Sequence, residues 1–279
     1  GFSIEENTSK SIFKNADLLK NIATERVISE FLKLICGKDA VKILDAYRET
    51  IAVIIPEITV MFNFNQNNIH HSYDLWQHTL TALGTIEPNP ILRMTMLLHD
   101  IGKPFVKTTD NSGQSHFQGH QLESKKIADR ILHRLRLPSD FINKTLLLIE
   151  YHDVRFNGSK KLMKKVMNVL GTDLTKQLVE VEYADISAQS EYQREEKLGY
   201  LETAKTHLNE IIKDNECFKL SQLDINGKDV LNLGVKEGRD VGNILDYLLM
   251  LVVDANVPNK KSILISKAKE YIYGNQMNK

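Results

Sequence analysis

The chain has 279 residues, a formal net charge of zero and 42% hydrophobic residues, which is the composition of an ordinary globular protein. A neutral total excludes a general electrostatic attraction to nucleic acids or membranes, so any such role must depend on a local basic patch. The two cysteines, Cys36 and Cys217, are too few for a disulfide framework or a cysteine zinc site. Together with the lack of a signal segment and of a long apolar run, they predict a cytoplasmic protein with no membrane partner.

Apolar residues recur at helical spacing along nearly the whole chain, and strand-like alternation is almost absent, which predicts an all-α fold. The chain exceeds the usual size of a single core, so two or three helical units are expected. We predict units at residues 1–68, 69–195 and 196–279, the first ending in a loop rich in asparagine and glutamine. Turn residues at 110–113 precede a short extended piece at Ser115–Phe117. Because the chain opens with Gly1 and not with methionine, we expect further residues upstream.

The adjacent residues His99 and Asp100, at the polar end of an apolar helix, are the most informative pair in the sequence. An imidazole nitrogen and a carboxylate oxygen side by side suit a divalent first-row metal ion. Other ligand-type residues lie in, or open, helical segments elsewhere, namely His78, His120, His152 and Asp185. Four helices could therefore bring their polar residues to one pocket.

Metal ligation is predicted for six residues, which are His78, His99, Asp100, His120, His152 and Asp185. The first ion would be bound by His78, His99, Asp100 and Asp185. His120 and His152 could bind a second ion bridged by Asp100, or stay without metal and act as phosphate contacts or general acids. The sequence leaves open one ion or two, and Mn, Ni, Co, Mg or Fe as the metal. His70, His71, His116 and His133 lack this pattern and are not expected to be ligands, although the loop around His116 could line the pocket.

A bound divalent ion can polarise phosphorus and lower the pKa of an attacking water, which suits phosphate-ester hydrolysis. Lys103 follows His99 by about one helical turn, where its ammonium could hold a phosphoryl oxygen. The catalytic residues of such a site would be Asp100, Lys103, His120 and His152.

Three features invite an RNA-binding interpretation. The lysines 160, 161, 164 and 165 could follow a phosphate backbone, although a solvated helix face explains them better. Tyr73 and Trp76 could stack on a base, although such aromatics more often pack in a core. The glycine-rich turn at 227–242 could hold a phosphate beside Lys236 or Arg239.

With these residues in view, the central block resembles the HD superfamily of metal-dependent phosphohydrolases, whose pattern is a His, a His-Asp pair and a late Asp. The matching residues are His78, His99, Asp100 and Asp185. His120 and His152 resemble the two additional histidines that some members have between the His-Asp pair and the last Asp. The segment Gly1–Ile4 through Glu25–Glu30 resembles the helical neck of bacterial CCA-adding tRNA nucleotidyltransferases and related poly(A) polymerases. The 227–242 turn resembles the C-terminal tail of these enzymes, so the resemblance extends over nearly the whole chain.

This resemblance implies an all-α HD domain between neck-like and tail-like helices, with a divalent metal, a nucleotide or phosphate-ester substrate, and tRNA as a partner. The implied chemistry is that of a phosphatase, a 2′-nucleotidase or a 2′,3′-cyclic phosphodiesterase. The sequence has no glycine-serine strand followed by paired carboxylates, so nucleotide addition by this chain alone is not expected. The alternatives are a tRNA-binding body with little hydrolytic activity and, from another class, a helical oxygenase with two irons on the same ligands.

Overall fold

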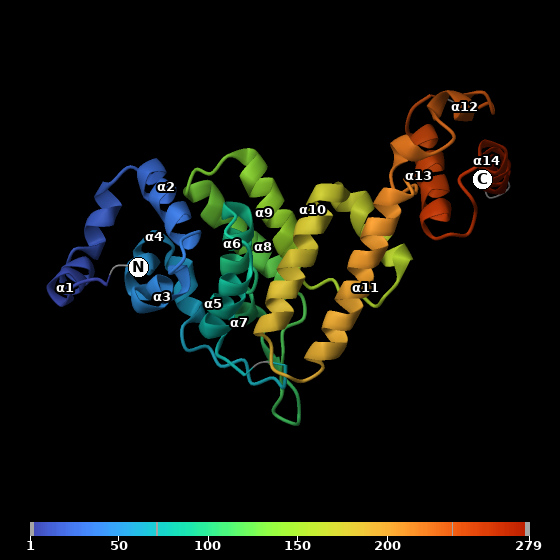
Figure 1. Ribbon diagram of the computed structural model, residues 1–279. Coiled ribbons are helices and arrows are strands. Elements are labelled where there is room, and N and C mark those ends of the chain that lie inside the picture. Colours follow the sequence, from blue (N-terminus) through green and yellow to red (C-terminus); the bar gives the residue numbers. More distant parts are fainter. Residues whose placement is uncertain (1–2, 71, 236, 277–279) are drawn as a thin grey trace. The chain divides into compact units, whose positions relative to one another are not determined.

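The computed structural model describes residues 3–70, 72–235 and 237–276, and it confirms the predicted all-α fold (Figure 1). Within these residues the only sheet is an antiparallel pair, β1 (Thr108–Thr109) and β2 (Ser115–His116), and β2 lies where the short extended piece was expected. In the same described part of the chain, no helix is both long and apolar enough to cross a membrane.

The helices follow one another through short connections. Before the strand pair they are α1 (Glu6–Lys14), the 3₁₀ helix η1 (Ala16–Asn21), α2 (Thr24–Ile35), α3 (Ala40–Ala46), α4 (Arg48–Ile54), the 3₁₀ helix η2 (Pro56–Met61), α5 (Leu75–Thr85), α6 (Pro90–Leu98) and α7 (Lys103–Val106). After it they are α8 (His120–Arg134), α9 (Ser139–Tyr151), α10 (Lys160–Ala188), α11 (Arg194–Lys213), the 3₁₀ helix η3 (Leu220–Gln222), α12 (Gly227–Leu231), α13 (Arg239–Val253) and α14 (Lys261–Gln276).

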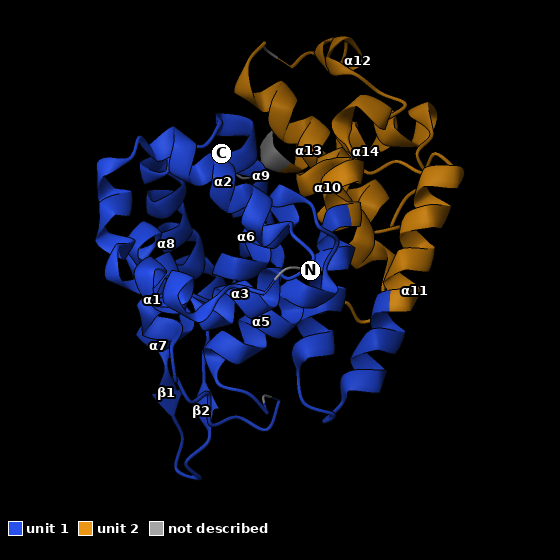
Figure 2. Cartoon of the chain, turned by 60° about the vertical axis from the view of Figure 1, so that its left-hand side comes forward, with its two compact units in different colours: residues 1–155, 177–201 blue, residues 156–176, 202–279 orange. Residues whose placement is uncertain are grey.

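The chain divides into two compact units (Figure 2). Unit 1 contains residues 1–155 and 177–201, and unit 2 contains residues 156–176 and 202–279. Helices α10 and α11 each have residues in both units, and α10 is interrupted at Gly171, whose φ of 71° is a left-handed value that glycine adopts without a Cβ clash. This division into two compact units does not test the predicted domain boundaries at residues 68 and 195, and these boundaries stay a prediction.

Helix α6 lies in the interior of unit 1 and packs against α2, α5 and α9. Its start is well defined, because the side chain of Asn89 accepts hydrogen bonds from the first backbone N–H groups and Pro90 occupies the first turn. All residues from Leu92 to Leu98, including Arg93 and Thr95, are buried, so this helix is enclosed on every side. Its C-terminal end, where His99 follows, is therefore held inside the unit.

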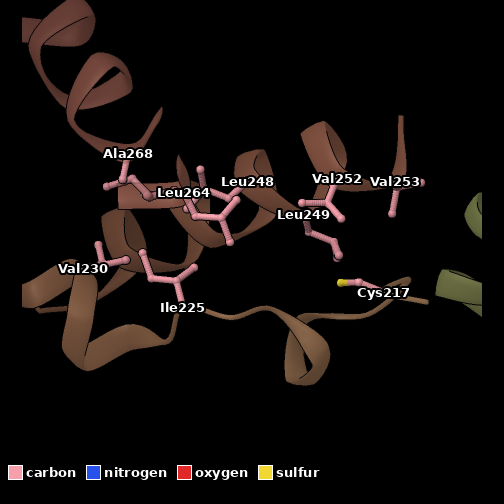
Figure 3. Close-up of a cluster of buried hydrophobic side chains, with 10 residues drawn as sticks. Cys217, Ile225, Val230, Leu248, Leu249, Val252, Val253, Leu264 and Ala268 are labelled. Atoms are coloured by element: carbon pink, nitrogen blue, oxygen red, sulfur yellow. The ribbon is translucent and has the colours of Figure 1, made fainter. Parts of the chain in front are cut away.

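Unit 2 has a core of its own, formed by α12, α13, α14 and the chain before α12 (Figure 3). Its buried members are Cys217, Ile225, Val230, Ile244, Leu248, Leu249, Val252, Val253, Leu264 and Ala268. The spacing of the α13 members, at Ile244, Leu248 and Val252, is the four-residue repeat of one helix face. Unit 2 thus buries apolar surface without help from the histidine-bearing helices.

The close approach of α7 to α8 yields a stability prediction. A Cβ added to Gly102 would lie 2.5 Å from the backbone N of Ser124 and 2.6 Å from the carbonyl O of His120. Gly102→Ala should therefore lower the free energy of unfolding by about 1–3 kcal/mol, as expected for overpacking, in urea denaturation followed by circular dichroism. Gly199→Ala is the control, since nothing lies within 4 Å of a Cβ at this position in α11. An unchanged midpoint for Gly102→Ala would contradict the close approach.

Candidate metal centre

Helix ends in unit 1 bring the predicted ligands together. His99 is the C-cap of α6 and Asp100 follows it, His152 is the C-cap of α9, and His120 is the first residue of α8. His78 lies in the first turns of α5, whose start is fixed by the side chain of Asp74 accepting a hydrogen bond from the N–H of Gln77. Asp185 lies in the last turn of α10. All six side chains are buried, apart from Asp185, which is partly exposed.

Four of the residues form a first group of possible ligands, whose donor atoms all lie within 4.8 Å of one another. His78 Nε2 is 2.9 Å from Asp185 Oδ1 and 3.4 Å from Asp100 Oδ2. His99 Nε2 is 3.2 Å from Asp100 Oδ2 and 3.4 Å from Asp185 Oδ1. Two atoms that each lie about 2.1 Å from one ion are about 3.0 Å apart at a right angle and about 3.4 Å apart at the tetrahedral angle. The first group has this spacing.

Asp100 also belongs to a second group, through its other oxygen. Its Oδ1 lies 3.3 Å from His120 Nε2 and 3.6 Å from His152 Nε2, and these two nitrogens are 3.1 Å apart. One carboxylate therefore directs Oδ2 to the first group and Oδ1 to the second. This is the arrangement that a carboxylate bridging two ions would require.

The tautomers of the four histidines follow from their second ring nitrogens. Each Nδ1 faces a backbone carbonyl, which can only accept a hydrogen bond. The carbonyls belong to Ala188 for His78, Met96 for His99, Phe117 for His120 and Ile149 for His152. Each Nδ1 therefore carries a proton, and each Nε2 directs its lone pair into the cluster, the orientation seen in metal-bound histidines.

A positive charge is needed between these lone pairs. In the neutral rings of His120 and His152, two Nε2 lone pairs would face each other at 3.1 Å. Within the described residues, His99 Nε2 and both oxygens of Asp100 are buried without a well-oriented hydrogen-bond partner. A divalent cation or added protons would satisfy these atoms. The residues thus fit a metal ion, and a mixed imidazole and carboxylate set suits divalent first-row metals.

Without metal, protons supply the positive charge. Burial lowers the pKa of His99, but the nearby carboxylates of Asp100 and Asp185 outweigh it and raise that pKa to about 10. Burial raises the pKa of Asp100, but His99 and Lys103 hold it well below its ordinary value. For Asp185, hydrogen bonds from His78 and His99 likewise outweigh burial and lower the pKa.

Lys103, predicted as a phosphate contact, lies inside the cluster and contacts Asp100. Its Nζ is 2.6 Å from Asp100 Oδ2 and donates to Gln66 Oε1 at 3.2 Å. It is 5% exposed, so the ammonium is held against the carboxylate. The role as a phosphate contact is not tested by this geometry and stays a prediction.

Two residues that the sequence interpretation missed orient Asp185. The amide of Gln189 donates to Asp185 Oδ2 at 2.8 Å, which leaves Oδ1 for the cluster. Lys197 Nζ donates in turn to Gln189 Oε1 at 2.6 Å and lies 3.4 Å from His70 Nδ1. Helical spacing could have pointed to Gln189, four positions after Asp185, whereas Lys197 is brought in by the tertiary fold.

The remaining predicted residues lie elsewhere. Within the described chain, His70, His116 and His133 belong to neither ligand group, while His71 and Lys236 lie outside the described residues. Arg239 opens α13 and is exposed. Trp76 is fully buried against Phe62, whereas Tyr73 is 51% exposed.

The four-lysine cluster in unit 2 is paired with acids of the same unit. Lys160 and Lys164 contact Glu216, and Lys161 and Lys165 contact Asp254. These ion pairs reduce the positive charge available to a phosphate backbone.

Fold and site define an all-α protein with a buried histidine and aspartate cluster suited to divalent metal. Two family models match the chain. Residues 1–62 match "Probable RNA and SrmB-binding site of polymerase A", and residues 120–268, just over half of the chain, match tRNA nucleotidyltransferase domain 2. The chain therefore belongs to the tRNA nucleotidyltransferase family.

Curated relatives carry related names. The chain is 29% identical over 278 residues to the CC-adding tRNA nucleotidyltransferase of Thermus thermophilus, covering 94% of this chain and 61% of the relative. It is 28% identical over 182 residues to the multifunctional CCA protein of Legionella pneumophila, covering 60% of this chain and 43% of the relative. It is 29% identical over 168 residues to the A-adding tRNA nucleotidyltransferase of Deinococcus radiodurans, covering 55% of this chain and 38% of the relative. The chain thus spans less than two thirds of the length of each.

These findings confirm the resemblance to the CCA-adding enzymes and correct the expected activity. The prediction of an HD-type phosphohydrolase is wrong, because the relatives and the matched family are nucleotidyltransferases. No relative named above supports the phosphate-ester substrate that came with that prediction. The error arose because a histidine and aspartate ligand set defines what can bind a metal ion and not which reaction follows.

Loss of the shared carboxylate should abolish metal binding. Asp100→Asn removes a charge that both ligand groups use, so the affinity for Mn²⁺ in equilibrium dialysis should fall by more than about 100-fold. Gln189→Ala frees Asp185 to rotate and should cost about 10- to 100-fold. Asp110→Asn is the matched control, because Asp110 is an exposed aspartate that contacts His116 outside the cluster. Wild-type Mn²⁺ affinity in Asp100→Asn would refute the ligand assignment.

Metal affinity should rise with pH. Because the pKa of His99 is about 10 in the metal-free protein, an ion that takes its Nε2 must displace a proton at neutral pH. We expect the affinity for Mn²⁺ to increase by up to about tenfold per pH unit between about pH 6 and pH 8. Calorimetric titration in two buffers of different ionisation enthalpy should show release of at least about one proton per ion. Affinity that is flat with pH would contradict a protonated His99.

Proposed function

We propose that this chain forms the RNA-binding part of a tRNA nucleotidyltransferase, with tRNA as its partner. The match of just over half of the chain to tRNA nucleotidyltransferase domain 2 carries the proposal. It is supported by the RNA-binding family model over residues 1–62 and by relatives named for CC, CCA and A addition. Transfer of nucleotides is the activity in the names of those relatives, and for this chain we propose only the recognition of the tRNA.

The first segment offers charges for this role. Among the described residues of 3–62, Lys14, Arg26 and Lys38 are exposed basic side chains with no acidic partner. They can neutralise phosphates without first breaking an ion pair, and phosphate neutralisation supplies most of the affinity in non-specific RNA binding. Arg239 in unit 2 stays a further predicted contact.

We also propose that unit 1 contains an HD-superfamily domain with one or two divalent ions. The spacing of His78, His99, Asp100 and Asp185 supports this assignment, and the position of Asp100 between the two groups supports two ions. The ions would join helix ends that come from five separate stretches of unit 1. In this proposal the cluster shapes the tRNA-binding body, and the catalytic roles predicted for its residues stay untested predictions.

Binding of tRNA should be strong in low salt and depend on the unpaired basic residues. In fluorescence anisotropy with labelled tRNA, the chain should bind with an affinity that falls steeply as KCl increases. Replacement of Lys14, Arg26 and Lys38 together by alanine should reduce the slope of log K against log salt by up to about 2 to 3, because each phosphate contact contributes about 0.7 to 0.9.

The matched control removes the same net charge from paired lysines. Lys10, Lys20 and Lys33 lie 2.5–2.7 Å from Glu6, Asp17 and Glu30. Their joint replacement by alanine should change the slope much less, because their charge is already locally balanced. No binding of tRNA by the wild-type chain at 50 mM KCl would overturn the proposed function.

A further inference from the structure

A cavity in unit 1 is lined by residues that belong to neither ligand group. It has a volume of about 800 Å³ and is lined by the loop before α5 and by the turn between β1 and β2. Small-molecule sites occupy about 300–1,000 Å³, so a nucleoside fits easily. The lining combines amide, hydroxyl and phenol groups with the carboxylate of Asp74 and the apolar side chain of Ile69, and it contains no lysine or arginine. Such a lining is unsuited to a phosphate group and suited to the edges of a base and the hydroxyls of a ribose.

The loop and the turn are fixed to each other, so the cavity is built before any ligand arrives. Asn67 Nδ2 donates to the carbonyl of Gly113, and Asn68 Nδ2 donates to the carbonyl of Ser115 at 2.8 Å. The N–H of Ser115 donates back to the carbonyl of Asn67 at 2.9 Å. These hydrogen bonds between the loop and the turn leave other polar groups of the lining available to a ligand. Among the described residues, the side chains of Ser72 and Gln114 have no hydrogen-bond partner.

Tyr73 supplies the aromatic surface. It lines the cavity and is 51% exposed, although a phenol ring of this size usually gains by burial. Its neighbour Trp76 is fully buried, so the two aromatics near His78 have different roles. An exposed aromatic beside unpaired amides is the combination by which proteins hold single-stranded bases.

A basic side chain lies next to the cavity. Lys107 is exposed, and its Nζ donates to the carbonyl of Asn65, a lining residue, at 2.8 Å. A strand whose base enters the cavity would find this ammonium close to its phosphate backbone. The positive charge therefore lies at the edge of the cavity, near the phosphate of a bound nucleotide, whereas the lining, which has no basic side chain, would face the base and the ribose.

We propose that this cavity binds one unpaired nucleobase of an RNA strand, stacked on Tyr73 and hydrogen-bonded by Gln114. The proposal deepens the proposed function and depends on it, because it names the part of the RNA that this unit recognises. It concerns a site separate from the metal ligands. The chemical class of the ligand is a nucleoside within single-stranded RNA, and inorganic phosphate alone should not occupy the cavity.

The test uses a fluorescein-labelled ten-nucleotide single-stranded RNA and anisotropy in 100 mM KCl. Tyr73→Ala should weaken binding about 5- to 100-fold, as expected for loss of one stacked base, and Gln114→Ala about 2- to 10-fold, as expected for a lost hydrogen bond. Tyr73→Phe should bind like the wild type, because the ring remains. Tyr200→Ala is the matched control, because Tyr200 is another exposed tyrosine of the same unit, at 42%, and does not line the cavity.

Competition separates base recognition from phosphate recognition. Adenosine or cytidine should displace the probe, whereas inorganic phosphate at the same ionic strength should not. Wild-type affinity in both Tyr73→Ala and Gln114→Ala, displacement by phosphate alone, or no binding of the probe would overturn the cavity proposal. Retained binding of intact tRNA in that case would leave the proposed function standing, so the two failures are distinguishable.

Discussion

The buried carboxylate of Asp100 is the group on which the interior of unit 1 depends. It is 1% exposed, four histidines and Lys103 surround it, and its oxygens divide between two ligand groups. An uncompensated buried charge costs several kcal/mol, so the helix ends that meet at Asp100 must bring positive charge with them. Protons on the histidines, the ammonium of Lys103 and a divalent ion are alternative sources of that charge. Metal binding is therefore an exchange of cations at a site that always needs them.

The fold class and the residues that form the histidine and aspartate cluster could be predicted from the sequence because both depend on local patterns. Helical periodicity is visible in any stretch of about 15 residues, and the adjacency of His99 and Asp100 needs no tertiary information. Two features could not be predicted from the sequence. One is that the two oxygens of Asp100 face different ligand groups, and the other is the set of contacts that Gln66 and Lys197 make. Gln66 is 37 residues from Lys103, and Lys197 is 127 residues from His70. No spacing rule reaches such distances, and only the packing of the helices creates these contacts.

The mistaken hydrolase prediction shows that a set of metal-binding residue types does not determine the function of a protein. The ligand atoms were identified from residue types, and their spacing in the structure fits a metal ion. A metal ion so held can act as a Lewis acid, a redox centre or a structural joint. The choice among these depends on what else reaches the ion, and the sequence pattern of the ligands carries no information about it. The family match extends over 120–268, so besides three of the candidate ligands it draws on many other residues and supplies what the ligand set could not.

Gln66 connects the cluster with the loop that lines the cavity. Its Oε1 accepts from Lys103, which contacts Asp100, while its Nε2 donates to the carbonyl of Tyr73 at 3.3 Å. A metal ion held by Asp100 Oδ2 would compete with Lys103 for that oxygen, because an ion and an ammonium repel each other at one acceptor. Any shift of the ammonium changes the hydrogen bond of Gln66, which holds the backbone of Tyr73. By thermodynamic linkage, a bound metal ion would change the affinity of the protein for RNA by the same factor as bound RNA would change its affinity for the metal ion. A measured coupling between the two would therefore report on the buried side-chain amide of Gln66.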